Sequence, residues 1–195
     1  MKYIYTEKDL DLVSWKKIDQ FIDKIYVDVK EYIDNNNLKI KYICPILRGG
    51  AVPAVKLSHM LNVIDMLPIQ LRKKDSTTTD IEIKLGLDYI KNPTIGNNEC
   101  ILLVEGNHYT GSSANTAVKL IKDKFGNDTK IIYVSLTRDY THRNSVEGTC
   151  YTAWAMTTNE TKGITEEECK ELGISNLATI FPWENIDEEL FEMNN

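Results

Sequence analysis

Apolar runs alternate along the chain with segments whose apolar residues repeat every three or four positions. The apolar runs, typical of strands buried on both faces, fall within residues 41–47, 101–104 and 130–137. The helical repeats fall within residues 15–35, 53–61 and 114–121. Strands that alternate with helices predict an α/β domain whose central, mostly parallel sheet is flanked by helices.

The carboxyl-terminal part continues this pattern less regularly. Apolar residues between 151 and 156 predict one more strand. The segment from Thr165 to Gly173 predicts a short helix with a capping box at its start and a glycine at its end. Residues 177–184 indicate a terminal strand and turn, and the acidic tail that follows begins as a helix.

Two features interrupt the pattern. Pro45 lies inside the first apolar run, and because proline has no N–H to donate, we expect the strand ladder to end near it. Residues 71–93 are polar and charged, with Ile81, Ile83 and Leu85 alternating as in a strand of a hairpin. A flexible flap over a site and a simple surface loop explain this second segment equally well.

Length and composition narrow the class of protein. The 195 residues contain no linker, so we expect a single domain over residues 1–195. A net charge of −6, from 23 basic and 29 acidic residues without a long basic run, argues against a protein that holds nucleic acid. We find no signal-peptide core and no apolar run long enough to span a membrane, and we expect a cytoplasmic protein. Four scattered cysteines and three histidines give no metal-ligand spacing, so we expect no metal held by side chains alone.

Candidate chemistry follows the predicted strands, where each strand ends. Arg48, Gly49 and Gly50 follow the first strand, and Glu105 ends the second. The next predicted helix is preceded by Thr110, Gly111, Ser112 and Ser113. Arg138 ends the third predicted strand. The carboxyl ends of parallel strands share one edge, where ligands bind, and a helix N-terminus favours phosphate. A plain tight turn would explain the two glycines equally well, but Arg48 beside them favours an anion site.

Four segments, in the order of the chain, resemble the type I phosphoribosyltransferases, specifically the purine branch that uses xanthine, guanine or hypoxanthine. They are Ser14-Trp15 before an amphipathic helix, residues 47–54, residues 101–113, and Phe181-Pro182-Trp183-Glu184. Because they span about residues 14 to 184 in the family's order, chance is a poor explanation. The resemblance implies that family's fold, with a flexible flap over residues 71–93 and a small C-terminal hood over residues 150–195.

The resemblance also implies roles for individual residues. Residues 110–113 would bind the 5′-phosphate of phosphoribosyl pyrophosphate (PRPP), and residues 48–50 would bind its pyrophosphate, often with a cis peptide in that turn. Glu105 would bond the ribose hydroxyls, and Mg²⁺ would bridge ribose and pyrophosphate oxygens rather than sit in a protein cage. The base would contact Arg138, Ile180, Phe181 and Trp183. The partners implied are PRPP and a nucleobase or nucleotide in purine salvage, with the chain as a homodimer or homotetramer.

The signature departs from the family at its acids. Gly106 stands where a second ribose-binding carboxylate is expected, Tyr109 replaces the aspartate that handles the base's ring proton, and Ala178 falls where a base-stacking aromatic is expected. His108 is a candidate replacement proton acceptor, or else an exposed loop histidine. Tyr109 would stack on a ligand or pack against the sheet.

Two functions therefore stay open. The first is an enzyme that transfers a phosphoribosyl group from PRPP to a purine-like base and releases pyrophosphate, with Glu105, His108 and Tyr109 as catalytic candidates. The second is a related protein that has lost catalysis and senses or sequesters a nucleotide or PRPP. The intact phosphate turns favour the first function, and the lost acids favour the second.

Overall fold

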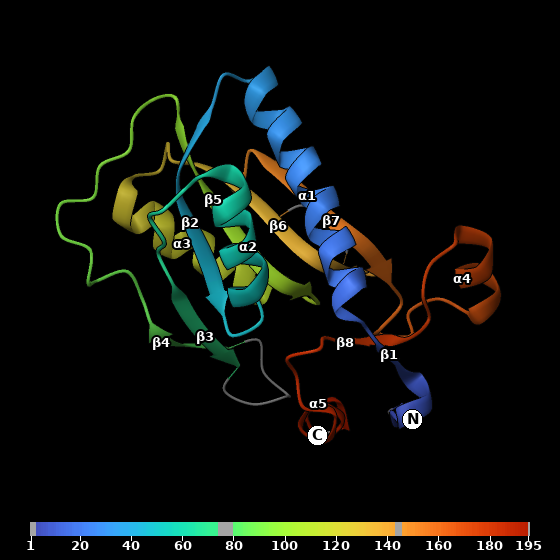
Figure 1. Ribbon diagram of the computed structural model, residues 1–195. Coiled ribbons are helices and arrows are strands. Elements are labelled where there is room, and N and C mark those ends of the chain that lie inside the picture. Colours follow the sequence, from blue (N-terminus) through green and yellow to red (C-terminus); the bar gives the residue numbers. More distant parts are fainter. Residues whose placement is uncertain (1–2, 74–79, 143–145, 195) are drawn as a thin grey trace.

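A computed structural model describes residues 3–73, 80–142 and 146–194. Its six-stranded central sheet has the order β4-β3-β2-β5-β6-β7 (Figure 1). The strands are β2 (Lys39–Leu47), β3 (Ile69–Lys73), β4 (Ile81–Leu85), β5 (Glu99–His108), β6 (Lys130–Asp139) and β7 (Tyr151–Thr158). Neighbouring strands are parallel, except that β3 and β4 form an antiparallel hairpin. The predicted α/β architecture is confirmed.

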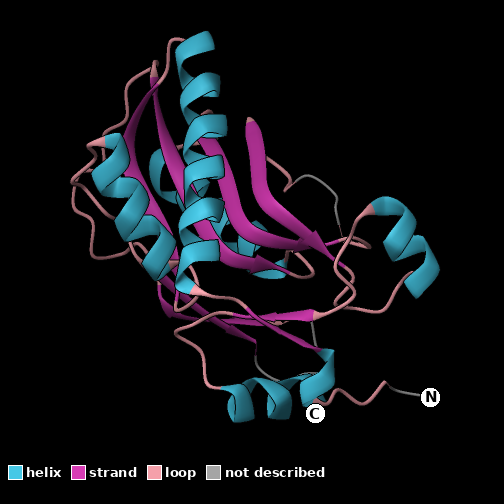
Figure 2. Cartoon of the chain, turned by 45° about the vertical axis from the view of Figure 1, so that its right-hand side comes forward, coloured by secondary structure: helices cyan, strands magenta, loops and turns pink. Residues whose placement is uncertain are grey.

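Helices cover both faces of this sheet. Two helices, α1 (Trp15–Asn35) and α2 (Ala51–Leu61), pack on one face. The helix α3 (Ser112–Phe125) packs on the other face (Figure 2). The helix α1 begins where Ser14 accepts a hydrogen bond from the backbone N–H of Lys17, at 3.3 Å. Its buried residues follow the helical repeat of the sequence: Ile18, Phe21, Ile22, Ile25, Val29 and Ile33.

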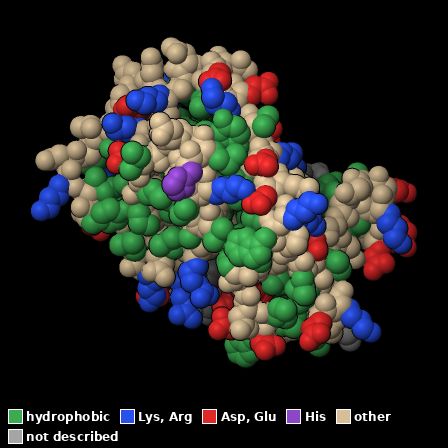
Figure 3. All heavy atoms as spheres, in the orientation of Figure 1, with side chains coloured by type: hydrophobic (Ala, Val, Ile, Leu, Met, Phe, Trp, Pro, Cys, Tyr) green, Lys and Arg blue, Asp and Glu red, His purple; other side chains and the backbone are tan. Residues whose placement is uncertain are grey.

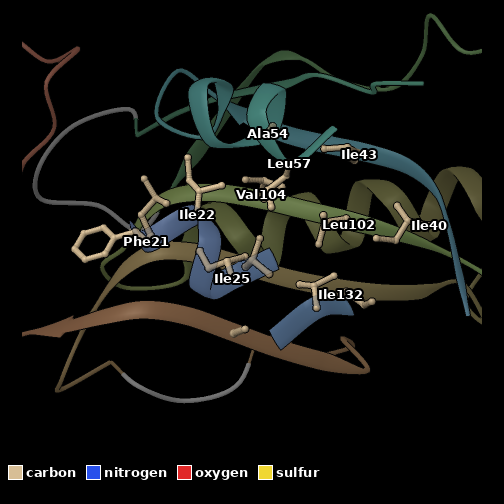
Figure 4. Close-up of a cluster of buried hydrophobic side chains, with 14 of the residues drawn as sticks. Phe21, Ile22, Ile25, Ile40, Ile43, Ala54, Leu57, Leu102, Val104 and Ile132 are labelled. Carbon is tan, nitrogen blue, oxygen red and sulfur yellow. The ribbon is translucent and has the colours of Figure 1, made fainter. Parts of the chain in front are cut away.

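The centre of the core is β5, which is buried on both faces. Leu102 and Val104 face α1 and α2, as Figure 4 shows, and Ile101 and Leu103 face α3. All four are at most 1% exposed. A strand buried on both faces needs a continuous apolar run rather than alternation, which is why the sequence predicted it so directly.

The hairpin of β3 and β4 begins at Ile69, two residues before the segment predicted to be a flap, and overlaps the first part of that segment. Residues 74–79, between its two strands, are outside the described part of the chain. Pro45 lies within β2 rather than at its end. The ladder with β5 extends to the pair Pro45–Val104, and β2 then continues to Leu47 by pairing with β3.

A second, two-stranded sheet lies at the carboxyl ends of the central strands (Figure 1). It pairs β1 (Leu10–Leu12) with β8 (Ala178–Ile180) in parallel and is preceded by the short helix η1 (Glu7–Asp9). We use "hood" for β1, β8 and the helix α5 (Ile186–Asn194). The predicted hood began at residue 150, but Tyr151–Thr158 is instead the edge strand of the central sheet. No residue pattern had predicted β1.

Between β7 and the hood lies α4 (Glu166–Leu172), the predicted capped helix. Thr165 accepts a hydrogen bond from the backbone N–H of Glu168, and Gly173 ends the helix in the left-handed conformation.

Within the described residues, we find no helix that is long and apolar enough to cross a membrane. Hydrophobic side chains gather around α2 on the face shown in Figure 3, where Val55 is 50% and Ile64 is 90% exposed.

The turn between β2 and α2 depends on a glycine. A Cβ on Gly50 would lie 2.2 Å from the carbonyl oxygen of Val104 and 2.8 Å from that of Ile46. We expect Gly50→Ala to lower the free energy of unfolding by roughly 3 kcal/mol, because two backbone strands would have to separate. Urea unfolding measures this change. Gly86→Ala is the control, since its nearest neighbour would be 3.5 Å away, and an equal loss in both variants would contradict the explanation.

Candidate functional site

Two turns at the carboxyl edge of the sheet carry the predicted phosphate-binding residues. The first, residues 48–50, joins β2 to α2, and the peptide bond between Leu47 and Arg48 is cis. The second, residues 110–113, leads from β5 into α3, with Gly111 in the left-handed conformation at φ +77°. The hydroxyls of Thr110 and Ser112 lie 3.0 Å apart in this second turn. Because α3 begins at Ser112, its first-turn N–H groups face the turn and are available to an anion.

The first turn contacts β5 where Gly49 lies against Gly106. A Cβ on Gly106 would lie 3.1 Å from the carbonyl carbon and oxygen of Gly49, tighter than ordinary van der Waals contact. A side chain at this position would therefore require the Gly49 backbone to shift by a few tenths of an ångström. Glu105 is the remaining acid of the signature at the end of β5.

Glu105 is held by a buried tyrosine. Tyr133, in the middle of β6 and 3% exposed, donates its hydroxyl proton to Glu105 Oε2 at 2.5 Å. Burial, together with the adjacent Glu105, raises the pKa of Tyr133 well above its usual value. The sequence predicted Tyr133 only as part of an apolar strand, and nothing in its surroundings signalled a polar role.

His108 lies beneath the second turn. It is 6% exposed, its Nδ1 is 2.9 Å from the Tyr133 hydroxyl, and its Nε2 is 3.1 Å from the carbonyl oxygen of His142. Desolvation by burial lowers the pKa of His108. A Cβ on Gly111 would lie 3.0 Å from His108 Cε1. The alternative of an exposed loop histidine is therefore wrong, and the ring supports the turn from below.

Tyr109 lies near the N-terminal segment and the loop after β7. Burial is the main cause that raises the pKa of Tyr109, and the nearby acids Glu160 and Asp139 raise it further. A hydrogen bond with the Tyr5 side chain lowers it. Tyr5 in turn donates its hydroxyl proton to the backbone oxygen of Glu160 at 2.6 Å. Position 109 thus joins β5 to the N-terminal segment and to the loop after β7.

Glu160 is a buried carboxyl that the sequence analysis missed. It is 6% exposed, and Asn107 donates to its Oε2 at 2.9 Å while Thr137 donates to Asn107 at 3.0 Å. Burial is the main cause that raises the pKa of Glu160 to about 7, although Asn107 and the backbone N–H of Thr179 oppose the rise. It connects β5 and β6 to the hood, and it lies in an irregular segment whose sequence gives no periodic signal.

Arg138 contacts an aromatic ring on the neighbouring strand. Its guanidinium carbon lies 3.3 Å from the ring centre of Trp154, and its Nε donates to Thr157 at 3.2 Å. A cavity beside this pair is lined by His108, Tyr133, Ser135, Arg138, Val146, Thr152 and Trp154. Its accessible volume of about 10 Å³ is close to what one water molecule needs. A base could use the face of Trp154 only after Arg138 moves.

Of the other predicted base-binding residues, Ile180 packs within the hood, whereas Phe181 and Trp183 pack with the main core. Ile180 and Phe181 are 3% and 2% exposed. Trp183 stacks on Phe181 with ring centres 4.9 Å apart and contacts Trp15 at 5.7 Å. These contacts are separate from the pair of Arg138 and Trp154.

Arg48 is exposed and faces acids of the hood region. Burial raises the pKa of Glu184 to about 7, and the positive charge of Arg48 opposes that rise. Burial also raises the pKa of Glu189 on α5, and Arg48 again opposes the rise. Glu184 accepts the backbone N–H of Phe181 at 2.8 Å.

Within the described ranges, no group of three or more acidic, histidine or cysteine side chains could hold a metal ion.

Several solved structures share the fold of this protein over nearly the whole chain. A purine phosphoribosyltransferase from Pyrococcus horikoshii has a TM-score of 0.63 and 18% identity, covering 91% of this chain and 95% of that one. The fold is that of the type I phosphoribosyltransferases. The Helicobacter pylori xanthine-guanine-hypoxanthine phosphoribosyltransferase gives 0.59 at 16% identity, covering 93% of this chain and 97% of that one.

A third structure with this fold is a hypothetical protein from Neisseria gonorrhoeae with bound ppGpp. Its TM-score is 0.66 at 15% identity, and the match covers 97% of this chain and 98% of that one. No family model and no curated protein matches the chain. The phosphoribosyltransferase fold is thus kept at identities where the sequence pattern has largely diverged.

The buried Glu160 gives a pH-dependent prediction. Its folded pKa of about 7 lies above the usual 4.5, so the folded state holds a proton that the unfolded chain releases, and stability falls as the pH rises between these values. We expect Glu160→Gln to be more stable than the wild type at pH 8 by roughly 3 kcal/mol, and equally stable at pH 4.

Urea unfolding at both pH values measures this difference. Glu171→Gln, which changes an exposed glutamate of α4, should follow the wild-type pH profile. A Glu160→Gln protein that is less stable than the wild type at pH 8 would show that the Glu160 charge is stabilising and would contradict the prediction.

Proposed function

We propose that this protein is a phosphoribosyltransferase that binds PRPP, transfers its phosphoribosyl group to a purine-like base and releases pyrophosphate. The observation that carries the proposal is the pair of turns, residues 48–50 and 110–113, on either side of Glu105 at one edge of the sheet. A nucleoside monophosphate needs one phosphate site. PRPP carries phosphate groups at two ends of one ribose, and two turns flanking an acid suit that ligand.

Each turn has a chemical reason to hold phosphate. The N-terminus of α3 supplies backbone N–H groups, with the hydroxyls of Thr110, Ser112 and Ser113 beside them. In the other turn, Gly49 and Gly50 allow close approach of a ligand to the backbone, and the exposed Arg48 supplies a guanidinium for pyrophosphate oxygens. Glu105 accepts from the ribose hydroxyls.

Mg²⁺ fits this proposal as a partner of the ligand. It commonly binds through one or two carboxylates together with substrate phosphates, and Glu105 is a carboxylate of this kind. When bound, the ion would neutralise charge on the leaving pyrophosphate. The chain's own contribution is to orient the ribose through Glu105 and to hold the two phosphate ends.

Transfer should be slow, because the base side of the site lacks its usual acid. Tyr109 occupies that position and is directed toward Tyr5 and Glu160. A missing general base typically costs 10²- to 10⁴-fold in rate, by order of magnitude.

A second candidate function is a nucleotide sensor, which binds without turnover. Two observations favour it: Gly106 leaves the site without a second acid beside Glu105, and one neighbour of the same fold was solved with ppGpp. A guanosine nucleotide with phosphates at both the 5′ and 3′ positions would also use two phosphate turns. Calorimetric titration with PRPP, GMP and ppGpp, beside a radiolabelled transfer assay with xanthine, guanine, hypoxanthine and adenine, separates the two functions.

The role of the first turn is tested by Arg48→Ala. We expect PRPP to bind about 10- to 100-fold more weakly, the loss expected for a charge-assisted contact of about 1.5–3 kcal/mol. Isothermal titration calorimetry measures the affinity. Lys119→Ala on α3 is the control, since it removes an exposed positive charge away from the turns. Equal affinities for the wild type and Arg48→Ala would contradict the assignment.

The role of position 109 is tested by restoring the acid. If the protein is a transferase that lacks a proton acceptor, Tyr109→Asp should raise turnover on the preferred purine by roughly 10²-fold. Tyr109→Asn is the matched control, because it removes the ring without supplying a base. PRPP binding with no turnover in the wild type and in Tyr109→Asp would contradict the transferase and support the sensor.

A further inference from the structure

The loop after β7 connects the central sheet with the hood through a single carboxyl group. Glu160, in this loop, is 6% exposed, and Asn107 at the end of β5 donates from Nδ2 to its Oε2 at 2.9 Å. On the other side, the backbone N–H of Thr179 in β8 donates to the same carboxyl. The Glu160 side chain therefore bridges the sheet and the hood.

The backbone of Glu160 holds the N-terminal segment as well. Tyr5 donates its hydroxyl proton to the backbone oxygen of Glu160 at 2.6 Å. The backbone N–H of Tyr5 donates to Asn194 Oδ1 at 2.8 Å, and Asn194 Nδ2 donates to the backbone oxygen of Tyr5 at 3.0 Å. The N-terminal segment, β8 and the end of α5 are thus all connected at Glu160.

The hood has a small core of its own. The buried apolar side chains of β1 and β8 form a cluster separate from the two clusters that cover the faces of the central sheet. At one end of the β1–β8 pair, Val13 donates its backbone N–H to the backbone oxygen of Ile180 at 3.0 Å and packs with the main core, as does Phe181. Glu160 attaches the hood at a different point, through the middle of β8. Because the hood has its own core, this attachment can open without disruption of either main cluster.

The charged and titratable groups that face Glu160 come from the sheet, the hood and the N-terminal segment. They are Tyr5 in the N-terminal segment, Tyr109 on β5, Asp139 on β6, Glu184 after β8 and Glu189 on α5. Burial raises the pKa of both tyrosines, which therefore stay neutral near pH 7. The three acids are negative when ionised, so each of them opposes a negative charge on Glu160.

We propose that Glu160 is the latch of the hood: it holds the hood against the sheet while its carboxyl is protonated, and it releases the hood when that proton is lost. In the closed state the carboxyl is buried among acids, where the charged form is unfavourable. In the open state water solvates the carboxylate, and the acids of the hood lie farther away. Rising pH therefore opens the hood, and falling pH closes it.

The pKa of Glu160 agrees with this direction. Burial is the main cause that raises it from 4.5 to about 7 in the closed state. A carboxyl that is exposed in the open state has an ordinary pKa, so the closed state binds the proton more tightly. Opening is therefore favoured increasingly as the pH rises from 4.5 to about 7, and by a constant factor above that range.

The position of the hood gives the latch a role in ligand access, a step that rests on the proposed function. The hood lies at the carboxyl ends of the central strands (Figure 1). The positive charge of Arg48 in the first turn acts on Glu184 and Glu189 of the hood region. An open hood therefore uncovers the edge that carries the two turns, and a closed hood keeps a ligand there. Protonation of Glu160 slows both the entry and the exit of PRPP.

Amide hydrogen exchange between pH 5 and pH 8, corrected for intrinsic exchange rates, measures opening of the hood without any ligand. We expect the protection of the β1 and β8 amides to fall with rising pH in the wild type, on the order of 100-fold more than in Glu160→Gln. The amides of Leu102 to Val104 in β5 should stay protected, since the opening is local. A fall of the same size in the wild type and in Glu160→Gln would overturn the proposal. In the wild type alone, the fall must level off near the midpoint of the native Glu160 titration measured by nuclear magnetic resonance, and a different midpoint would overturn it as well.

Two further variants separate the Glu160 carboxyl from its surroundings. Glu184→Gln removes another acid whose pKa burial raises to about 7, but whose carboxyl accepts the backbone N–H of Phe181 in its own turn. This variant should keep the part of the pH dependence that Glu160→Gln loses. Tyr5→Phe removes the hydroxyl that donates to the backbone of Glu160 and should weaken protection equally at both pH values. Loss of the pH dependence in Tyr5→Phe would contradict its assignment to the carboxyl, and native-like amide spectra confirm that the variants fold.

Dissociation of PRPP, followed by stopped flow at pH 8, tests the role of the latch in access. We expect PRPP to leave Glu160→Gln roughly tenfold more slowly than the wild type, because the hood stays closed over it. Equal rates would overturn the role in access alone. If PRPP binds neither protein in calorimetry, the proposed function fails, while hydrogen exchange still decides whether Glu160 is the latch.

Discussion

The burial of β5 on both faces is the constraint on which the rest of the structure depends. Because Leu102 and Val104 pack under α1 and α2 while Ile101 and Leu103 pack under α3, the strand has a single possible position in the sheet. Its carboxyl end is fixed as a result, and with it Glu105, the Gly49–Gly106 contact and the start of α3. A site that must hold two ends of one ligand gains precision from being built around a strand that cannot shift.

This constraint also explains how much the sequence could predict. The central strands, the long helices and the two glycine turns follow from local patterns, and the structure confirms them. The apolar residues between 177 and 184 predicted β8, but β1 is only three residues long and exists through its pairing with β8, so no local pattern marks it. Tyr133 looked like a core residue because its ring is one, and only its hydroxyl, aimed at Glu105, reveals its second role. Glu160 and the Arg138–Trp154 pair likewise depend on contacts between distant segments.

The departures from the family signature form a consistent set. Gly106 permits the first turn to lie against β5, Tyr109 lies near Tyr5 and Glu160, and the ring of His108 lies beneath Gly111. Gly106 and Tyr109 each stand where the family signature has a carboxylate. The edge of the sheet around the two turns is therefore less acidic than the family signature would make it.

The pairing of β1 with β8 has a consequence for the order in which the protein assembles. These strands come from opposite ends of the described chain, and closing so long a loop is entropically costly until the intervening sheet exists. Contacts of such large sequence separation form late. The hood should therefore dock onto a finished core, and a newly made chain would pass through a stage in which its phosphate turns are already formed while the hood beside them is still unfolded.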